Sequence, residues 1–195
     1  MALGAYALAT LANAKVYLGI ADTTWDPVLE MLIDAVSEQF NSYTDRVLLN
    51  ATYTALLLDG NGKEILYLPN APITTLTSVY ENDNLLTEGS TADFIKYAAE
   101  GYLYRVDGHW AEGQQNIKIT YTAGYVVVTT PTIPKDLQMA VYLQVALLWK
   151  EQKTKAWGES ARTVPAGSTS QASQATDQPL DPRVKAILDK YVRIR

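Results

Sequence analysis

Among the residues that could do chemistry, the sequence has a single histidine, His109. The segment DGHWAEG places Asp107 and Glu112 close to it, a grouping that can serve acid–base catalysis or metal binding. A metal site needs several converging ligands, however, and the chain has no cysteine and no second histidine. We therefore interpret His109 as an exposed loop residue, and we predict no catalytic residue, no metal ligand and no cofactor.

Other catalytic signatures are missing as well. A serine hydrolase of the usual kind would need that histidine as its base, and no Gly-x-Ser-x-Gly turn is present. The stretch DGNGK at 59–63 is rich in glycine but lies between predicted strands, so it indicates a hairpin turn rather than a phosphate-binding loop. A carboxylate pair for glycoside hydrolysis stays open, because any two of the 21 acidic residues could meet in space, but no motif selects a pair.

Aromatic residues are the other group that could bind a ligand. Thirteen tyrosines and four tryptophans could build a platform that stacks on sugars or bases. Tyrosine is favoured in strands for packing reasons, so we assign most of these residues to packing and the remainder to an interface. The tyrosines of the β-rich segment are Tyr53, Tyr67, Tyr80, Tyr97, Tyr102, Tyr104 and Tyr121.

The elements that must position these residues begin with helices, which we predict near 10–19, 26–48, 134–153 and 181–193. The second has Asp26 as a good N-cap and proline in the first turn. Its apolar residues recur every three or four positions, as one helix face requires. They are Leu29, Leu32, Ile33, Val36, Phe40, Tyr43 and Val47.

Between the helices, residues 50–128 show short β-rich runs separated by glycine turns. We predict strands at 53–58, 65–68, 76–80, 94–97, 102–106 and 117–121, with the first two joined as a hairpin. The fold class is therefore α+β, a helical bundle with an inserted antiparallel β subdomain. The predicted parts are a helical core (1–49 and 129–157), the β subdomain (50–128), a flexible linker (158–180) and a C-terminal docking helix (181–195).

The third helix is apolar on nearly every side, since only Gln138 and Gln144 are polar between Leu137 and Trp149. Such a helix must be buried on more than one side, and a neighbouring subunit could supply the second cover. We predict a subunit interface made by Met139, Tyr142, Leu143, Ala146 and Trp149. The short C-terminal helix is marginal alone in water, so it needs a docking surface on its own fold or on a partner.

Composition limits the function further. The 195 residues are 48% hydrophobic, which is enough for a core, and the net charge of −5 argues against a general nucleic-acid binder. The N-terminus has no basic region before its apolar run, so we do not interpret it as a signal peptide. No apolar run is long enough for a transmembrane helix, and the lack of cysteine fits an intracellular assembly environment.

The order of these segments resembles the head–tail connector (adaptor) family of tailed bacteriophages. The similarity lies in LATLANAKVYLGI with DPVLEMLIDAVSEQFNSYTDR, in YLPNAPITTLTSVYEN with its bend at Pro69 and Pro72, and in IKITYTAGY with IPKDLQMAVYLQVALLWKE. Together these stretches cover most of residues 8–152. The β segment is longer than in the smallest all-helical members.

The resemblance implies a virion structural protein without catalytic activity, made in the host cytoplasm and located at the head–tail junction. Such proteins form a homo-oligomeric ring, commonly a dodecamer, that binds the portal protein. The ring extends the DNA channel, lets double-stranded DNA pass without sequence-specific binding, and docks the next component, a stopper or tail-tube protein. No membrane contact is implied. Portal contacts are then expected from Arg183, Val184, Lys185, Ile187, Leu188, Tyr191 and Arg193.

Two alternatives stay open. The first is another neck component, such as a stopper or tail-completion protein, which would be richer in β structure. The second is a carbohydrate-binding or carbohydrate-active module built on the tyrosine-rich segment 50–128.

Overall fold

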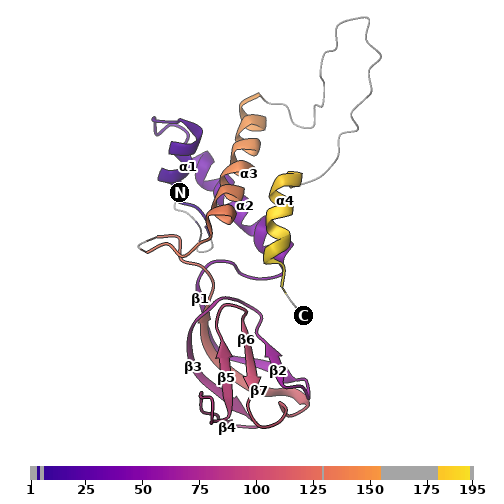
Figure 1. The fold of residues 1–195 in the computed structure, drawn as a ribbon. Helices are drawn as coiled ribbons and strands as arrows, with labels where there is room; N and C mark the ends of the chain where they lie inside the picture. The colour runs from indigo at the N-terminus through magenta and orange to yellow at the C-terminus, as the bar shows by residue number, and fades with distance from the viewer. Residues whose placement is uncertain (1–3, 5–6, 129, 155–179, 194–195) are drawn as a thin grey trace, which may run out of the picture. The chain divides into compact units, whose positions relative to one another are not determined.

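The computed structural model describes residues 4, 7–128, 130–154 and 180–193 (Figure 1). Of the predicted linker 158–180, all but Leu180 lies outside the described residues. The architecture is α+β, as predicted. The helices are α1 (Leu11–Leu18), α2 (Asp26–Thr44), α3 (Lys135–Thr154), α4 (Pro182–Leu188) and the 3-10 turn η1 (Asp189–Tyr191). The strands are β1 (Ala51–Gly60), β2 (Ile65–Tyr67), β3 (Ile73–Glu81), β4 (Asn84–Leu85), β5 (Phe94–Tyr97), β6 (Tyr102–Arg105) and β7 (Gly113–Ala123).

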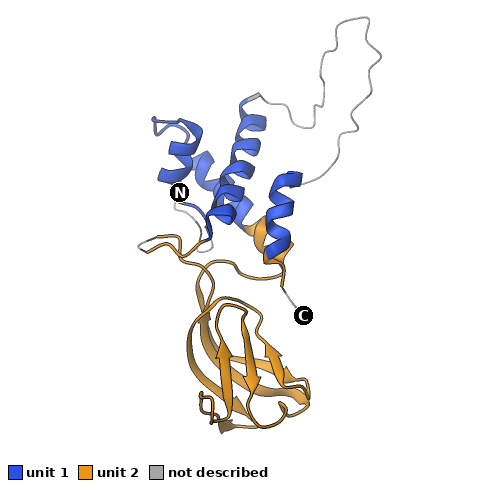
Figure 2. Ribbon diagram, in the orientation of Figure 1, with its two compact units in different colours: residues 1–37, 134–190 blue, residues 38–133, 191–195 orange. Residues whose placement is uncertain are grey.

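The chain divides into two compact units, coloured separately in Figure 2. The helical unit comprises residues 1–37 and 134–190, and the β unit comprises residues 38–133 and 191–195. The long helix α2 contributes to both. None of the described helices combines the length and the apolarity needed to cross a membrane.

The ends of the helices follow from local chemistry. The Oγ1 atom of Thr10 accepts a hydrogen bond from the Asn13 amide at 3.3 Å, which caps the start of α1. Gly19 ends this helix with a φ of 68°, a left-handed conformation that glycine adopts easily. Helix α2 ends at Thr44, before the predicted residue 48, because Asp45 leaves the helical region with a φ of 54°.

The core of the helical unit lies where α1 and α4 pack against α3. Fully buried side chains come from each of these helices and from the first part of α2. Ser37 is polar but buried, and its hydroxyl donates to the Ile33 carbonyl at 2.7 Å and accepts from the Leu8 amide at 2.9 Å. The apolar members include Ala14, Leu29, Ile33, Val36, Leu137, Val141, Val145, Val184 and Leu188.

The β unit contains two antiparallel sheets with the strand orders β1-β7-β3-β4 and β2-β6-β5. One buried cluster takes side chains from both, so the sheets pack face to face. Leu66, Phe94 and Leu103 come from the three-stranded sheet, and Ile119 and Tyr121 come from β7 of the other. The inserted β subdomain is therefore a small sandwich with a closed core.

The predicted hairpin between the first two strands is wrong. Strand β1 pairs with β7, from Ala51 opposite Ala123 to Gly60 opposite Gly113, whereas β2 pairs with β6. The long strand β7 can form backbone hydrogen bonds along the whole length of β1, whereas β2, with three residues, cannot. The turn itself exists, with Gly62 at a φ of 65°, and it carries the chain from one sheet to the other.

A short strand that the sequence did not reveal, β4, pairs with the end of β3. Asn82 and Asp83 connect the two with φ values of 48° and 62°, the conformation that a tight two-residue hairpin turn requires. Asn and Asp tolerate this conformation better than other residues with side chains.

Candidate functional site

Helix α3 is covered on one side only. Leu137, Val141 and Val145 are fully or almost fully buried in the helical unit. On the opposite side Met139 is 46% exposed. Tyr142, Leu143 and Ala146 beside it are half-buried. We call Met139, Tyr142, Leu143 and Ala146 the α3 stripe. Its own chain leaves this predicted interface partly open.

The apolar surface continues from the α3 stripe onto α1. The ring of Tyr17 stacks on that of Tyr142, with centroids 5.5 Å apart and planes 24° apart. Val16, next to Tyr17, is 82% exposed. Burial raises the pKa of Tyr142 above its ordinary value.

Trp149, the last residue of the predicted interface, is in a different environment. It is 8% exposed and packs edge-on against Trp25, with ring centroids 5.3 Å apart. The ammonium group of Lys153 lies 4.9 Å and 5.2 Å from the centroids of the Trp25 and Trp149 rings. Trp149 is therefore covered by its own chain and offers little surface to a neighbour.

Helix α4 is docked on its own chain. Asp181 caps it by accepting from the Arg183 amide at 2.8 Å, and the Asp181 amide donates to Oε1 of Gln144 in α3 at 3.2 Å. Val184 and Leu188 are fully buried. These two residues, expected to contact the portal, instead belong to the core of the helical unit, because the i, i+4 face of α4 packs against α3.

The other residues expected at the portal are divided between the two units. Arg183 and Lys185 are exposed on α4, with Ile187 half-buried near them. The Arg183 guanidinium pairs with Asp181 at 3.0 Å, and this hydrogen bond lowers the pKa of the Asp181 carboxyl. In the β unit, Tyr191 meets the Tyr125 ring edge-on and the Arg193 amide donates to the Thr44 carbonyl at 2.9 Å.

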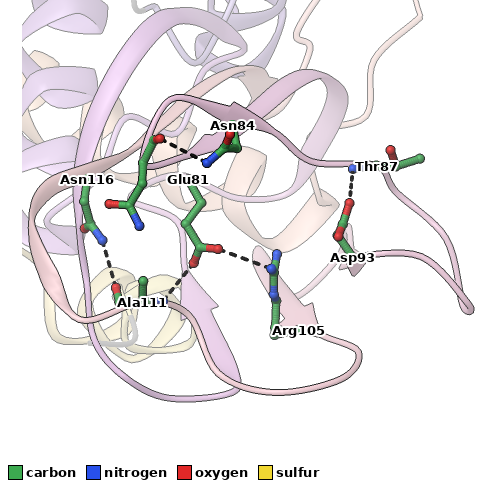
Figure 3. A network of polar contacts seen from close by, with 8 residues as sticks. Glu81, Asn84, Thr87, Asp93, Arg105, Ala111 and Asn116 are labelled. Atoms are coloured by element: carbon green, nitrogen blue, oxygen red, sulfur yellow. Dashed lines mark hydrogen bonds and ion pairs between the residues drawn. The ribbon is translucent and has the colours of Figure 1, made fainter.

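The loop that carries His109 is held by the polar network in Figure 3. The Glu81 carboxylate accepts from the Ala111 amide at 2.8 Å and pairs with Arg105 at 3.2 Å. The Arg105 guanidinium also lies over the ring of Trp110, 5.4 Å from its centroid, and Trp110 is fully buried. These contacts join β3 to β6 and fix the path of the loop.

His109 itself is exposed at the tip of this loop, as predicted. It lies beside the turn formed by Asn61, Lys63 and Glu64. Across the described ranges, no three histidine or acidic side chains come close enough together to hold a metal ion. The contacts of Glu81 and Arg105 hold the loop in place.

One further surface, not predicted from the sequence, is the outer face of the three-stranded sheet. Residues directly opposite on paired strands share a face, and the rows Ile65–Tyr104–Ile95 and Tyr67–Tyr102–Tyr97 alternate with the buried row that contains Leu66 and Leu103. The sequence does contain a sign of this surface, because each of the three strands has two large residues that lie two positions apart. The six residues Ile65, Tyr67, Ile95, Tyr97, Tyr102 and Tyr104 are named here the tyrosine face.

The sequence matches the family described as head completion protein over residues 7–194. The chain belongs to the head completion protein family. This membership confirms the resemblance drawn from the sequence, and with it the class of function, a structural component of the phage neck at the junction of head and tail. None of the curated proteins compared with this head completion protein matches it.

Solved structures share the fold of this head completion protein at low sequence identity. A chain in the neck of an empty GTA particle computed with C6 symmetry has a TM-score of 0.54 at 15% identity, covering 100% of this chain and 94% of that one. A chain in the virion of a native gene transfer agent particle has a TM-score of 0.55 at 17% sequence identity, and the match covers 100% of this chain and 94% of that one. A chain in the neck of a native GTA particle computed with C12 symmetry has a TM-score of 0.53 at 17% sequence identity, and the match covers 100% of this chain and 93% of that one.

Proposed function

We propose that this head completion protein is a ring-forming head–tail connector, acting by assembly and without catalysis. In this proposal identical copies form a dodecameric ring on the portal protein, extend the DNA channel and present a docking face to a stopper or tail-tube protein. Two of the structures with a similar fold are necks computed with C6 and C12 symmetry, and both symmetries are compatible with such a ring.

The observation that carries the proposal is the open α3 stripe. A helix buried on one side by its own unit still presents Met139, Tyr142, Leu143 and Ala146 on the other. Apolar residues grouped on an exposed face mark an interaction surface. Covering this face with an adjacent copy removes it from water and links one subunit to the next.

The portal contact is assigned to the exposed side of α4. Arg183, Lys185 and Ile187 lie there, whereas Val184 and Leu188 hold the helix to α3. Tyr191 and Arg193, which belong to the β unit, are proposed as portal contacts of that unit. A basic and partly apolar rim of this kind would suit an acidic, partly apolar groove on the portal.

The acidic character of the chain supports a passive role toward DNA. With a net charge of −5, the protein offers few basic groups to neutralise phosphates, so a channel built from it would hold DNA weakly. Double-stranded DNA could then slide past without sequence-specific contact.

The proposal predicts that Met139→Glu prevents ring formation, because a carboxylate in the covered stripe would lose its water. Met31→Glu is the matched control, since Met31 is an exposed methionine on α2 of the same unit, 55% exposed. Native mass spectrometry of the full chain, with and without portal, should show rings for the wild type and Met31→Glu and monomers for Met139→Glu. Rings of equal abundance for all three proteins would contradict the assignment of the stripe.

A further inference from the structure

The tyrosine face does not have the polar composition of a sheet surface that is exposed to solvent. All six of its positions carry tyrosine or isoleucine, and none carries a charge. The outer face of the other sheet in the same unit is different. Its row of directly paired residues consists of Thr52, Thr122 and Thr75, and the next row contains Thr120 and Ser78. The same outer face also carries the row Leu57–Lys118–Tyr80, so it is mixed in character, with threonine, serine and lysine among its apolar residues. The tyrosine face, by contrast, has neither a charged nor a small polar side chain at any of its six positions.

The arrangement of the rings argues against a sugar-binding platform. The rings of Tyr97 and Tyr102 lie nearly parallel, 17° apart, with centroids 4.5 Å apart. Tyr67 meets Tyr102 on its other side at 60° and 5.6 Å. Because the Tyr97 and Tyr102 rings cover one face of each other, this pair leaves less open ring face for a sugar or a base to stack on than two separate rings would.

Nucleic acid is disfavoured for a second reason. Binding to a phosphate backbone depends on lysine and arginine, and the tyrosine face contains neither. Tyrosine is instead one of the residue types enriched at protein–protein interfaces, where the ring supplies apolar contact and the hydroxyl a hydrogen bond. The chemistry therefore favours a protein as occupant.

The small exposed area of the α3 stripe favours a second copy of this chain as the protein that covers the tyrosine face. Val16, Tyr17 and Met139, which are 82%, 40% and 46% exposed, leave roughly 340 Å² accessible between them, taking about 200 Å² for one whole large side chain, and the other residues of the stripe are half-buried. A stable interface buries about 800 Å² on each partner. A closed ring of more than two copies also joins two different faces of the chain, so each subunit needs a second contact surface.

We propose that the tyrosine face is this second surface and is covered by an adjacent copy of the same chain in the ring. The inference rests on the proposed ring and names a further part of its subunit interface. A neighbouring copy would bury Tyr97, which is 39% exposed, and receive hydrogen bonds from the tyrosine hydroxyls at the ring edges.

The chain contains no cysteine, so a single introduced thiol reports on one position. We would place it at Tyr97→Cys, with Tyr104→Cys as a second site on the same face should the first variant misfold by circular dichroism. Thr75→Cys, exposed in the threonine row of the other sheet's outer face, is the matched control. Each full-length variant is treated with a polar maleimide as assembled ring and as monomer obtained by dilution.

The expected result is that the thiols at 97 and 104 react at least about tenfold more slowly in the ring than in the monomer, whereas the thiol at 75 reacts equally in both. Equal reactivity at 97 and 104 in ring and monomer would overturn the inference and leave the proposed ring intact. If the ring forms without portal and the thiols at 97 and 104 become protected only after portal is added to that ring, the inference is also overturned, because the occupant would then be another protein. A chain that stays monomeric with portal present removes the proposed function and this inference together.

Discussion

At the scale of single residues, Tyr121 shows how the β unit places a polar group in an apolar core. The side chain is fully buried and stacks on Tyr53, with ring centroids 5.1 Å apart. Burial raises the pKa of its hydroxyl, and nearby Asn70 and Arg193 partly oppose this shift. The folded protein therefore holds Tyr121 neutral at a pH where the unfolded chain begins to ionise it.

This shift predicts a loss of stability in alkali. Below pH ~10 the hydroxyl is neutral in both states, so Tyr121 contributes no pH dependence there. As the pH rises above this value the unfolded chain loses the proton first, and the free energy of unfolding falls by up to about 1.4 kcal/mol per pH unit until the folded pKa is reached. Urea unfolding at a series of pH values should show a shallower decline for Tyr121→Phe than for the wild type. Identical slopes would mean that the hydroxyl is accessible to solvent in the folded state.

At the scale of elements, α4 has two chemically different sides. Its Val184 and Leu188 side pairs with α3, while Arg183 and Lys185 face outward. A helix this short is unstable alone, so tertiary packing must hold it in place.

The packing of α4 predicts opposite results for its two sides. Leu188→Ala should lower the free energy of unfolding by about 2–5 kcal/mol, because it opens a cavity in the helical unit. Lys185→Ala, on the exposed side, should change stability by less than about 0.5 kcal/mol and weaken attachment to the portal. Chemical denaturation and a portal pull-down measure the two effects. If Leu188→Ala left stability unchanged, α4 would be a tethered helix rather than part of the core.

Helices were predictable from the sequence because their signals are local. Thr10 and Gly19 bound α1, and the apolar repeat through Leu29 and Ile33 identifies α2. The pairing of the strands could not be predicted, because β1 pairs with β7, which lies far along the chain, and no local sequence pattern specifies that register. The α3 stripe was predicted from apolarity alone. The tyrosine face was missed, since individual tyrosines in strands look like packing residues until the pairing is known.

At the scale of the whole molecule, the described surfaces fit an assembly better than an isolated protein. The helical unit presents the α3 stripe and the exposed side of α4, and the β unit presents the tyrosine face. A subunit of a ring on a portal needs contacts to its neighbours and to the portal, and these surfaces would supply both. Membership of the head completion protein family gives the same class of function from an independent direction.

The central claim is that this chain closes into a ring, and its mass tests that claim most directly. We would measure the purified full-length protein by native mass spectrometry, alone and mixed with its portal protein. The account predicts one dominant closed assembly, a dodecamer, in at least one of the two samples. A protein that remained a monomer in both, at concentrations where portal itself is assembled, would contradict it.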